Sequence, residues 1–158
     1  MRYFLIDKVT SLTVGQSATG VKCVSLSDEI LHDHFPDYPT MPGALVIESM
    51  AQLSGFLLEM TLNRPGEPLV RALLGQIGSA KFYRASSPGD RMEVTVRIQS
   101  LLAGAAQVSG EVFVGEERAV RADLTFVLKK VDSERIHEQR RYVYKLWTRD
   151  FAPPLTIL

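Results

Sequence analysis

Two residues of this sequence have the chemistry of a proton acceptor and a proton donor, His34 and Glu48. Both lie in the stretch 31–55, LHDHFPDYPTMPGALVIESMAQLSG, where a proline-rich segment leads into an almost wholly apolar one. An imidazole with an ordinary pKa of about 6.5 can take up or release a proton around neutral pH. A carboxylate among apolar residues is costly unless something needs it, so Glu48 is a candidate for function.

The stretch that begins at Pro42 or Gly43 predicts a helix, because proline is tolerated at the first helical position. Glu48 then falls in the second turn, where the helix N-terminus favours the charged carboxylate and burial favours the neutral acid. Since the effect of the terminus is only about 0.3 to 1 kcal/mol, we expect burial to dominate and to make Glu48 a proton donor. Gln52 follows one helical turn later.

The first N–H groups of this helix, at its Gly43 end, have no partners within the helix and can hold an oxygen atom that is becoming negative. A base at His34, an acid at Glu48 and such an oxyanion site are what α,β-elimination next to a thioester requires. One group removes the proton at C2, another protonates the departing hydroxyl at C3, and the amides stabilise the charge on the carbonyl oxygen.

Each of these residues also has a purely structural interpretation. A single histidine in a loop is more often structural than catalytic, and a glutamate in a helix is usually exposed. His32 and His34 form an H-x-H pair that could bind a metal. The chain has only three histidines, and no third ligand stands at a spacing typical of metal sites, so we predict no metal site. We also expect no redox cofactor, because a thioester already acidifies the proton next to it.

The elements that must position these residues follow from the hydrophobic periodicity. Strands, marked by alternation and by turn residues between them, are predicted at 3–14, 18–26, 70–84, 90–102, 105–115 and 118–130. The loop 27–42 leads into the helix, which continues to about Leu62 and ends before Pro65. That helix is apolar nearly all round, as expected for one wrapped by other structure. The predicted fold class is α+β, with a curved antiparallel β-sheet wrapped around a long central α-helix.

The tail 131–158 has a different composition and is predicted to be a C-terminal extension to a domain at 1–130. Its stretch SERIHEQRRYVYKLW can form a helix, and APPLTIL cannot continue it. The side chains predicted on the apolar side of this helix are Ile136, Tyr142, Val143, Leu146 and Trp147.

Composition restricts the class of protein. A chain of 158 residues has room for one domain with a proper core. Eighteen basic residues balance eighteen acidic ones, so we expect binding neither to nucleic acid nor to an anionic membrane. Cys23 is the only cysteine, which excludes an internal disulfide and suits a reducing cytoplasm. The N-terminus has the alternation of a strand, not of a signal peptide, and Glu48, Gln52 and Glu59 interrupt the longest apolar run.

The central segment resembles a known family, the 3-hydroxyacyl-[acyl-carrier-protein] dehydratases of bacterial fatty acid synthesis (the FabZ/FabA group). The shared pattern is H-F-P, then P-x-M-P-G, then an acid five residues after that glycine, then A-Q. It is present as His34-Phe35-Pro36, Pro39-Thr40-Met41-Pro42-Gly43, Glu48 and Ala51-Gln52. The stretches YFLIDKV and AKFYRASSPGD resemble the family's first strand and its K-F to P-G-D turn, so the likeness covers about residues 2–130.

The resemblance implies a hot-dog fold and the reversible dehydration of a 3-hydroxyacyl thioester, carried by acyl carrier protein, to the trans-2-enoyl thioester. It implies that His34 is the catalytic histidine, Glu48 the catalytic acid, Gly43 a donor to the thioester carbonyl and Gln52 a residue that orders the site. In the family the histidine of one subunit meets the acid of the other, which implies a homodimer with shared sites or a larger assembly of dimers. Glutamate at position 48 favours the plain dehydratase over one that also isomerises the double bond.

Several alternatives and secondary assignments stay open at this point. The aromatic residues Phe35, Phe56, Phe82 and Tyr83 are candidates to line an acyl tunnel, although aromatics of this kind are more often core. The basic residues Lys81, Arg84, Arg91, Arg140, Arg141 and Lys145 are candidates to meet the acidic carrier protein. Asp33 stands where the family has glycine, and it either favours the charged imidazole of His34 or orients its ring. An acyl-thioester hydrolase or a non-catalytic acyl-binding protein of the same fold is the alternative function.

Overall fold

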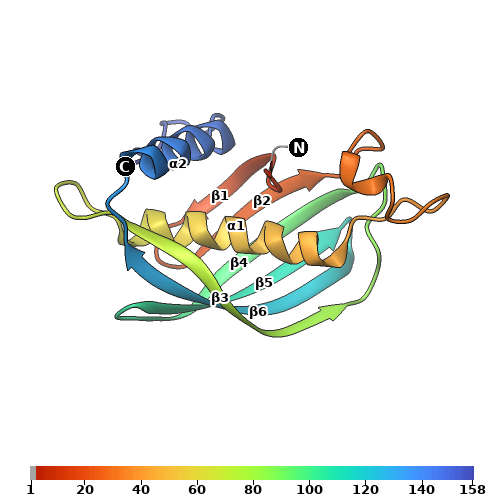
Figure 1. Ribbon diagram of the computed structural model, residues 1–158, viewed down its shortest axis with the longest axis horizontal. Helices are drawn as coiled ribbons and strands as arrows, with labels where there is room; N and C mark the ends of the chain where they lie inside the picture. The colour runs from red at the N-terminus through yellow and green to blue at the C-terminus, as the bar shows by residue number, and fades with distance from the viewer. Residues whose placement is uncertain (1–2) are drawn as a thin grey trace.

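The computed structural model describes residues 3–158 and consists of one antiparallel sheet curved around a central helix (Figure 1). The strands are β1 (Lys8–Thr13), β2 (Ser17–Cys23), β3 (Val70–Phe82), β4 (Arg91–Leu102), β5 (Ala105–Val114) and β6 (Glu117–Lys130). The helices are α1 (Gly43–Leu62), α2 (Glu134–Trp147) and the short 3₁₀ helix η1 (Glu29–Leu31). The strand order across the sheet is β1-β2-β4-β5-β6-β3. The predicted fold class is confirmed, and so is the extent of α1.

The first two predicted strands are longer than the observed ones, and a hydrogen bond gives the reason for the first. β1 begins at Lys8, whereas the alternation of apolar residues starts before it. Leu5 and Ile6 are buried, but the N–H of Leu5 donates to the side chain of Gln52 on α1, at 3.0 Å. The apolar residues before β1 are therefore buried against the helix, and backbone pairing with β2 begins only at Asp7, whose N–H donates to the carbonyl of Val21 at 2.8 Å.

Helix α1 is the core of the molecule because its apolar surface is covered on most sides. Leu53, Phe56 and Leu57 have no exposed surface. By length and composition α1 could cross a membrane, and it is the one helix of the described residues that could. Two thirds of the most apolar 18-residue segment of α1 (67%) is buried inside the chain, as expected of the core helix of a folded domain.

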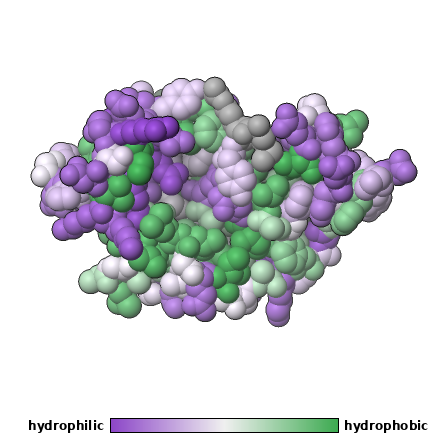
Figure 2. All heavy atoms as spheres, viewed as in Figure 1, coloured by the Kyte–Doolittle hydropathy of each residue, from purple (hydrophilic) through white to green (hydrophobic). Residues whose placement is uncertain are grey.

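Strand β3 forms an edge of the sheet and carries several exposed apolar side chains. Within residues 3–158 it pairs along its length with β6 alone. Leu73, Leu74, Ile77 and Phe82 are each between 38% and 56% exposed. Figure 2 shows hydrophobic side chains gathered over this part of the surface. A long edge strand with exposed apolar side chains is the kind of surface that can pair with another chain.

Helix α2 belongs to the same core as the sheet and α1, but only part of its predicted apolar face is buried. Its buried residues are His137, Val143, Tyr144 and Trp147. Ile136, Tyr142 and Leu146, which the sequence placed on the apolar side, are each at least 39% exposed. The prediction is confirmed for Val143 and Trp147 and wrong for the other three. The buried face also includes two polar side chains, His137 and Tyr144, because their hydrogen-bond partners lie on other elements.

Those partners form a buried network around the carboxylate of Glu59 on α1. Its Oε2 accepts hydrogen bonds from Arg71 Nη1 and from the hydroxyl of Tyr144, both at 2.8 Å. Its Oε1 accepts the backbone N–H of Ala72 at 3.2 Å. Arg71 Nη2 donates to Nδ1 of His137 at 2.8 Å. The network therefore ties α2 to both α1 and β3.

The phenol of Tyr144 makes stability depend on pH in the alkaline range. Burial raises its pKa well above the ordinary value of 10.0, and the Glu59 carboxylate raises it further, against the opposing charges of Arg140 and Arg71. The unfolded chain therefore loses this proton first as pH rises, so the stabilisation is complete below pH 10 and declines above it. We expect the melting temperature between pH 8 and 11 to fall more steeply for the wild type than for Tyr144→Phe. Parallel curves for the two proteins would contradict this assignment.

Candidate active site

His34 lies on the loop between η1 and α1 and is held in one orientation. Its Nδ1 is 2.8 Å from the backbone oxygen of Thr40, and the N–H of Thr40 donates to the backbone oxygen of His34 at 2.7 Å. Because a carbonyl oxygen only accepts, Nδ1 carries a proton, and in the neutral ring Nε2 then has the free lone pair. The ring stacks on Phe35 with centroids 4.1 Å apart. The half-buried imidazole thus presents one nitrogen that can act as a base.

Asp33 does not provide the orienting contact. Its side chain is exposed, and the orientation of the His34 ring comes from the carbonyl of Thr40 instead. Thr40 was not predicted as part of the site. It is six residues from His34, across the prolines of the loop, and no sequence signal distinguishes a residue that contributes only its carbonyl oxygen.

The start of α1 at Gly43 is packed against the end of β3. Leu45 and Val46 are the first residues of the helix whose N–H groups donate to the carbonyl of Pro42. The N–H groups before them, in the first turn, are those that a helix cannot satisfy itself. A Cβ atom at Gly43 would lie 2.7 Å from Cε1 of Phe82, so the ring can sit this close to the helix start only because residue 43 has no side chain. Phe82 therefore covers one side of the predicted oxyanion site.

Glu48 is half-buried on α1, and its carboxylate is held by Gln52. Gln52 Nε2 donates to Glu48 Oε1 at 3.1 Å and to the backbone oxygen of Tyr3 at 3.2 Å. Gln52 Oε1 accepts the N–H of Leu5 at 3.0 Å. Partial burial raises the pKa of the Tyr3 phenol, and the nearby charge of Glu48 raises it further. Gln52 therefore connects the N-terminal segment to Glu48 and fixes the position of its carboxylate.

A large open cavity of about 740 Å³ runs beside Glu48. From α1 it is lined by Glu48, Ala51, Gln52 and Gly55, which lie on one face of the helix. His34 is not among its lining residues. A single chain therefore brings Glu48 and Gln52 together in one cavity but does not bring His34 to the same wall.

The four aromatic candidates for tunnel lining do not line this cavity. Phe56 has no exposed surface and packs edge to face on Tyr144 and Trp147, with centroids 5.0 and 6.4 Å away, so its assignment was wrong. It lies on the core face of α1, which sequence periodicity could not separate from the cavity face because both are apolar. Phe35, Phe82 and Tyr83 are more than half exposed. They remain available to a substrate or a second chain.

The metal and carrier-protein assignments both stay predictions. Among the described residues, no group of three or more His, Cys, Asp or Glu side chains could hold a metal ion. Several candidate carrier-binding residues are already engaged: Arg84 pairs with Asp90 and Glu117, at 3.3 and 3.2 Å, and Arg91 pairs with Glu93 at 3.6 Å. Lys81 and Lys145 are exposed.

Comparison with known proteins identifies a family and several relatives. Residues 1–123 match the model of the FabA-like domain. A protein of Pelotomaculum thermopropionicum named 3-hydroxyacyl-[acyl-carrier-protein] dehydratase FabZ is 35% identical over 127 residues, which are 80% of this chain and 89% of the relative. A protein of the same name from Levilactobacillus brevis is 36% identical over 129 residues, which are 82% of this chain and 85% of the relative.

Solved structures show the same fold at low sequence identity. A Streptococcus mutans protein bound to acetyl coenzyme A has a TM-score of 0.65 and 16% identity, covering 84% of this chain and 96% of that one. A hot-dog-like protein from Thermanaerovibrio acidaminovorans has a TM-score of 0.61 and 17% identity, covering 84% of this chain and 93% of that one. At these identities the likeness concerns the fold alone, which is the hot-dog fold.

Proposed function

The chain belongs to the FabA-like family, and from this premise we propose that it is a 3-hydroxyacyl-[acyl-carrier-protein] dehydratase. It converts a 3-hydroxyacyl thioester reversibly to the trans-2-enoyl thioester, in fatty acid or related lipid or polyketide synthesis. The observation that carries the proposal is the His34 ring, whose Nδ1 is held by the Thr40 carbonyl so that Nε2 is left to act as a base. The substrate arrives on acyl carrier protein, and the reaction takes place in the cytoplasm.

Each site residue has one task in the reaction, either a proton transfer or a stabilising hydrogen bond. Nε2 of His34 accepts the proton from C2, and the electron pair of that C–H bond forms the double bond to C3. The C3–O bond breaks as Glu48, acting as the acid, donates a proton to the departing hydroxyl, which leaves as water. The N–H of Gly43 donates to the thioester oxygen as it becomes negative. Gln52 keeps the Glu48 carboxyl in place through their 3.1 Å hydrogen bond.

Two copies of the chain are needed for a complete site. His34 of one protomer meets Glu48 of the other, which accounts for a cavity that holds Glu48 and Gln52 but not His34. The edge strand β3, with Leu73, Leu74 and Ile77 exposed, supplies an apolar surface for pairing the two copies. The functional unit is then a homodimer with two shared sites, alone or within a larger assembly of dimers.

The reaction can be followed directly with the purified protein and a 3-hydroxyacyl thioester. We expect the absorbance of the conjugated enoyl thioester to appear without release of free thiol. Release of thiol at the same rate would assign the protein to thioester hydrolysis instead. Binding of the thioester without any conversion would identify a non-catalytic acyl-binding protein, and either result would overturn the proposed function.

A further inference from the structure

Helix α2 forms one wall of the cavity that contains Glu48. Ile136, Gln139, Arg140, Val143 and Trp147 line the cavity from α2. Figure 1 shows α2 beside the C-terminal half of α1, and the match to the family model ends at residue 123, before α2 begins. This wall of the cavity is therefore built by a part of the chain that the matched family model does not include.

The direction of the substrate along α1 follows from the proposed function, on which this inference rests. The thioester carbonyl is held at Gly43, at the N-terminal end of α1, and Glu48 lies beyond it along the helix. The acyl chain after C3 then continues toward Gly55, about 10 Å further at 1.5 Å per residue. Gly55 and α2 line the same cavity, so the far end of the acyl chain comes to α2.

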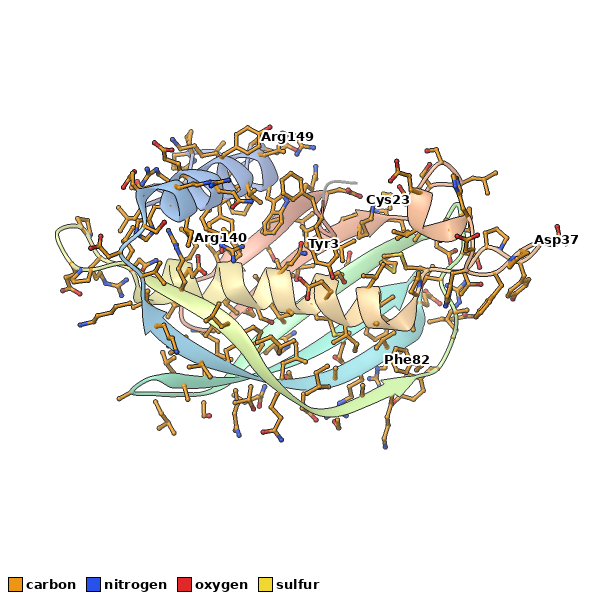
Figure 3. The ribbon with its side chains drawn as sticks, in the orientation of Figure 1. Tyr3, Cys23, Asp37, Phe82, Arg140 and Arg149 are labelled. Carbon is orange, nitrogen blue, oxygen red and sulfur yellow. The ribbon has the colours of Figure 1, made fainter. Side chains whose placement is uncertain are left out.

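Arg140 is the unusual member of this wall. Most of the cavity lining that surrounds it is apolar, including Leu73, Phe126 and Trp147. Figure 3 shows Arg140 in the space between α2 and α1. It is half-buried, and it makes no hydrogen bond or ion pair with any residue of the described part of the chain. Arg71, the other guanidinium that reaches the cavity, is paired with Glu59 at 2.8 Å.

A half-buried guanidinium without a partner is costly beside a purely alkyl ligand and favourable beside an anion. Its planar arrangement of donors fits a carboxylate through two parallel hydrogen bonds. We propose that Arg140 recognises a carboxylate at the far end of the acyl chain, so that the preferred substrate is an ω-carboxy-3-hydroxyacyl thioester. Arg140 is then a specificity residue and has no part in the proton transfers at C2 and C3.

The test compares two 3-hydroxyacyl thioesters of equal chain length on the same carrier, one ending in a carboxylate and one in a methyl group. We expect the wild type to have the higher kcat/KM for the carboxylate substrate. Arg140→Gln should lower that kcat/KM by about 10-fold to 100-fold and change the kcat/KM of the methyl-terminated substrate much less. Arg135→Gln is the matched control, because Arg135 is exposed on α2 and does not line the cavity.

Equal effects of Arg140→Gln on the two substrates, or a wild-type preference for the methyl-terminated one, would overturn the proposal. Thermal melting of the variant separates a loss of recognition from a loss of fold. If the wild type converts neither substrate, the proposed function fails, and calorimetric binding of the two corresponding acyl-pantetheine amides still tests Arg140. Binding that does not distinguish the carboxylate end from the methyl end would then reject the role of Arg140 by itself.

Discussion

Dehydration by the His34→Ala and Glu48→Gln variants is expected to be slower than wild type by about 10²-fold to 10⁴-fold in kcat, the usual contribution of a positioned acid or base. Alanine removes the Nε2 lone pair that accepts the C2 proton. Glutamine keeps the shape of Glu48 and its place beside Gln52 but has no proton of carboxylic acidity to give. The measurement is the rate of enoyl thioester formation from a 3-hydroxyacyl thioester.

His32→Ala is the matched control for the histidine, because His32 is an exposed imidazole two residues away on the same loop. It should retain nearly the wild-type rate. Both active-site variants should also melt close to the wild type, since neither His34 nor Glu48 is fully buried. Undiminished turnover in either variant would reject the role assigned to that residue.

The same two variants also test whether each site is shared between protomers. In a mixed dimer of His34→Ala and Glu48→Gln chains, one site receives both intact residues and the other receives both replacements. Random pairing makes half of the dimers mixed, so about a quarter of the wild-type activity should return when the two are co-expressed. Activity no higher than that of the single variants would place both residues of each site on one chain.

The features that were predictable from the sequence are those whose causes are local. The bounds of α1 follow from Pro42 and Gly43 at its start and from Asn63 and Pro65 after its end. The spacing from Gly43 to Glu48 then places the carboxylate in the second turn. A long apolar segment with clear start and stop signals contains most of the information that sets the bounds of its helix.

The features that could not be predicted depend on residues far apart in the chain. Tyr144 is 85 residues from its partner Glu59, and His137 is 66 residues from Arg71. Both side chains are buried because of those partners, and the helical periodicity of α2 contains no trace of them. The same limit applies to Phe56, whose place in the core is decided by Tyr144 and Trp147 on α2.

Loss of the Glu59 carboxylate is expected to have the largest effect on stability. Arg71 is 2% exposed, and Glu59 holds its Nη1 at 2.8 Å. In Glu59→Leu the guanidinium stays buried without its carboxylate, and the hydroxyl of Tyr144 and the N–H of Ala72 lose their acceptor. Removing one partner of a buried ion pair costs about 3 to 5 kcal/mol, so the free energy of unfolding in urea should fall by that amount.

Two further variants identify the cause of that loss. Glu48→Leu makes the same replacement on the same helix, but at a half-buried carboxylate whose hydrogen-bond partner is Gln52, so the free energy of unfolding should change little. Glu59→Leu combined with Arg71→Met removes both charges, and replacing a buried ion pair by apolar side chains is often neutral or stabilising. The double variant should therefore be more stable than Glu59→Leu alone. If it is not, the contribution of Glu59 comes from the hydrogen bonds to Tyr144 and Ala72 and not from the charge of Arg71.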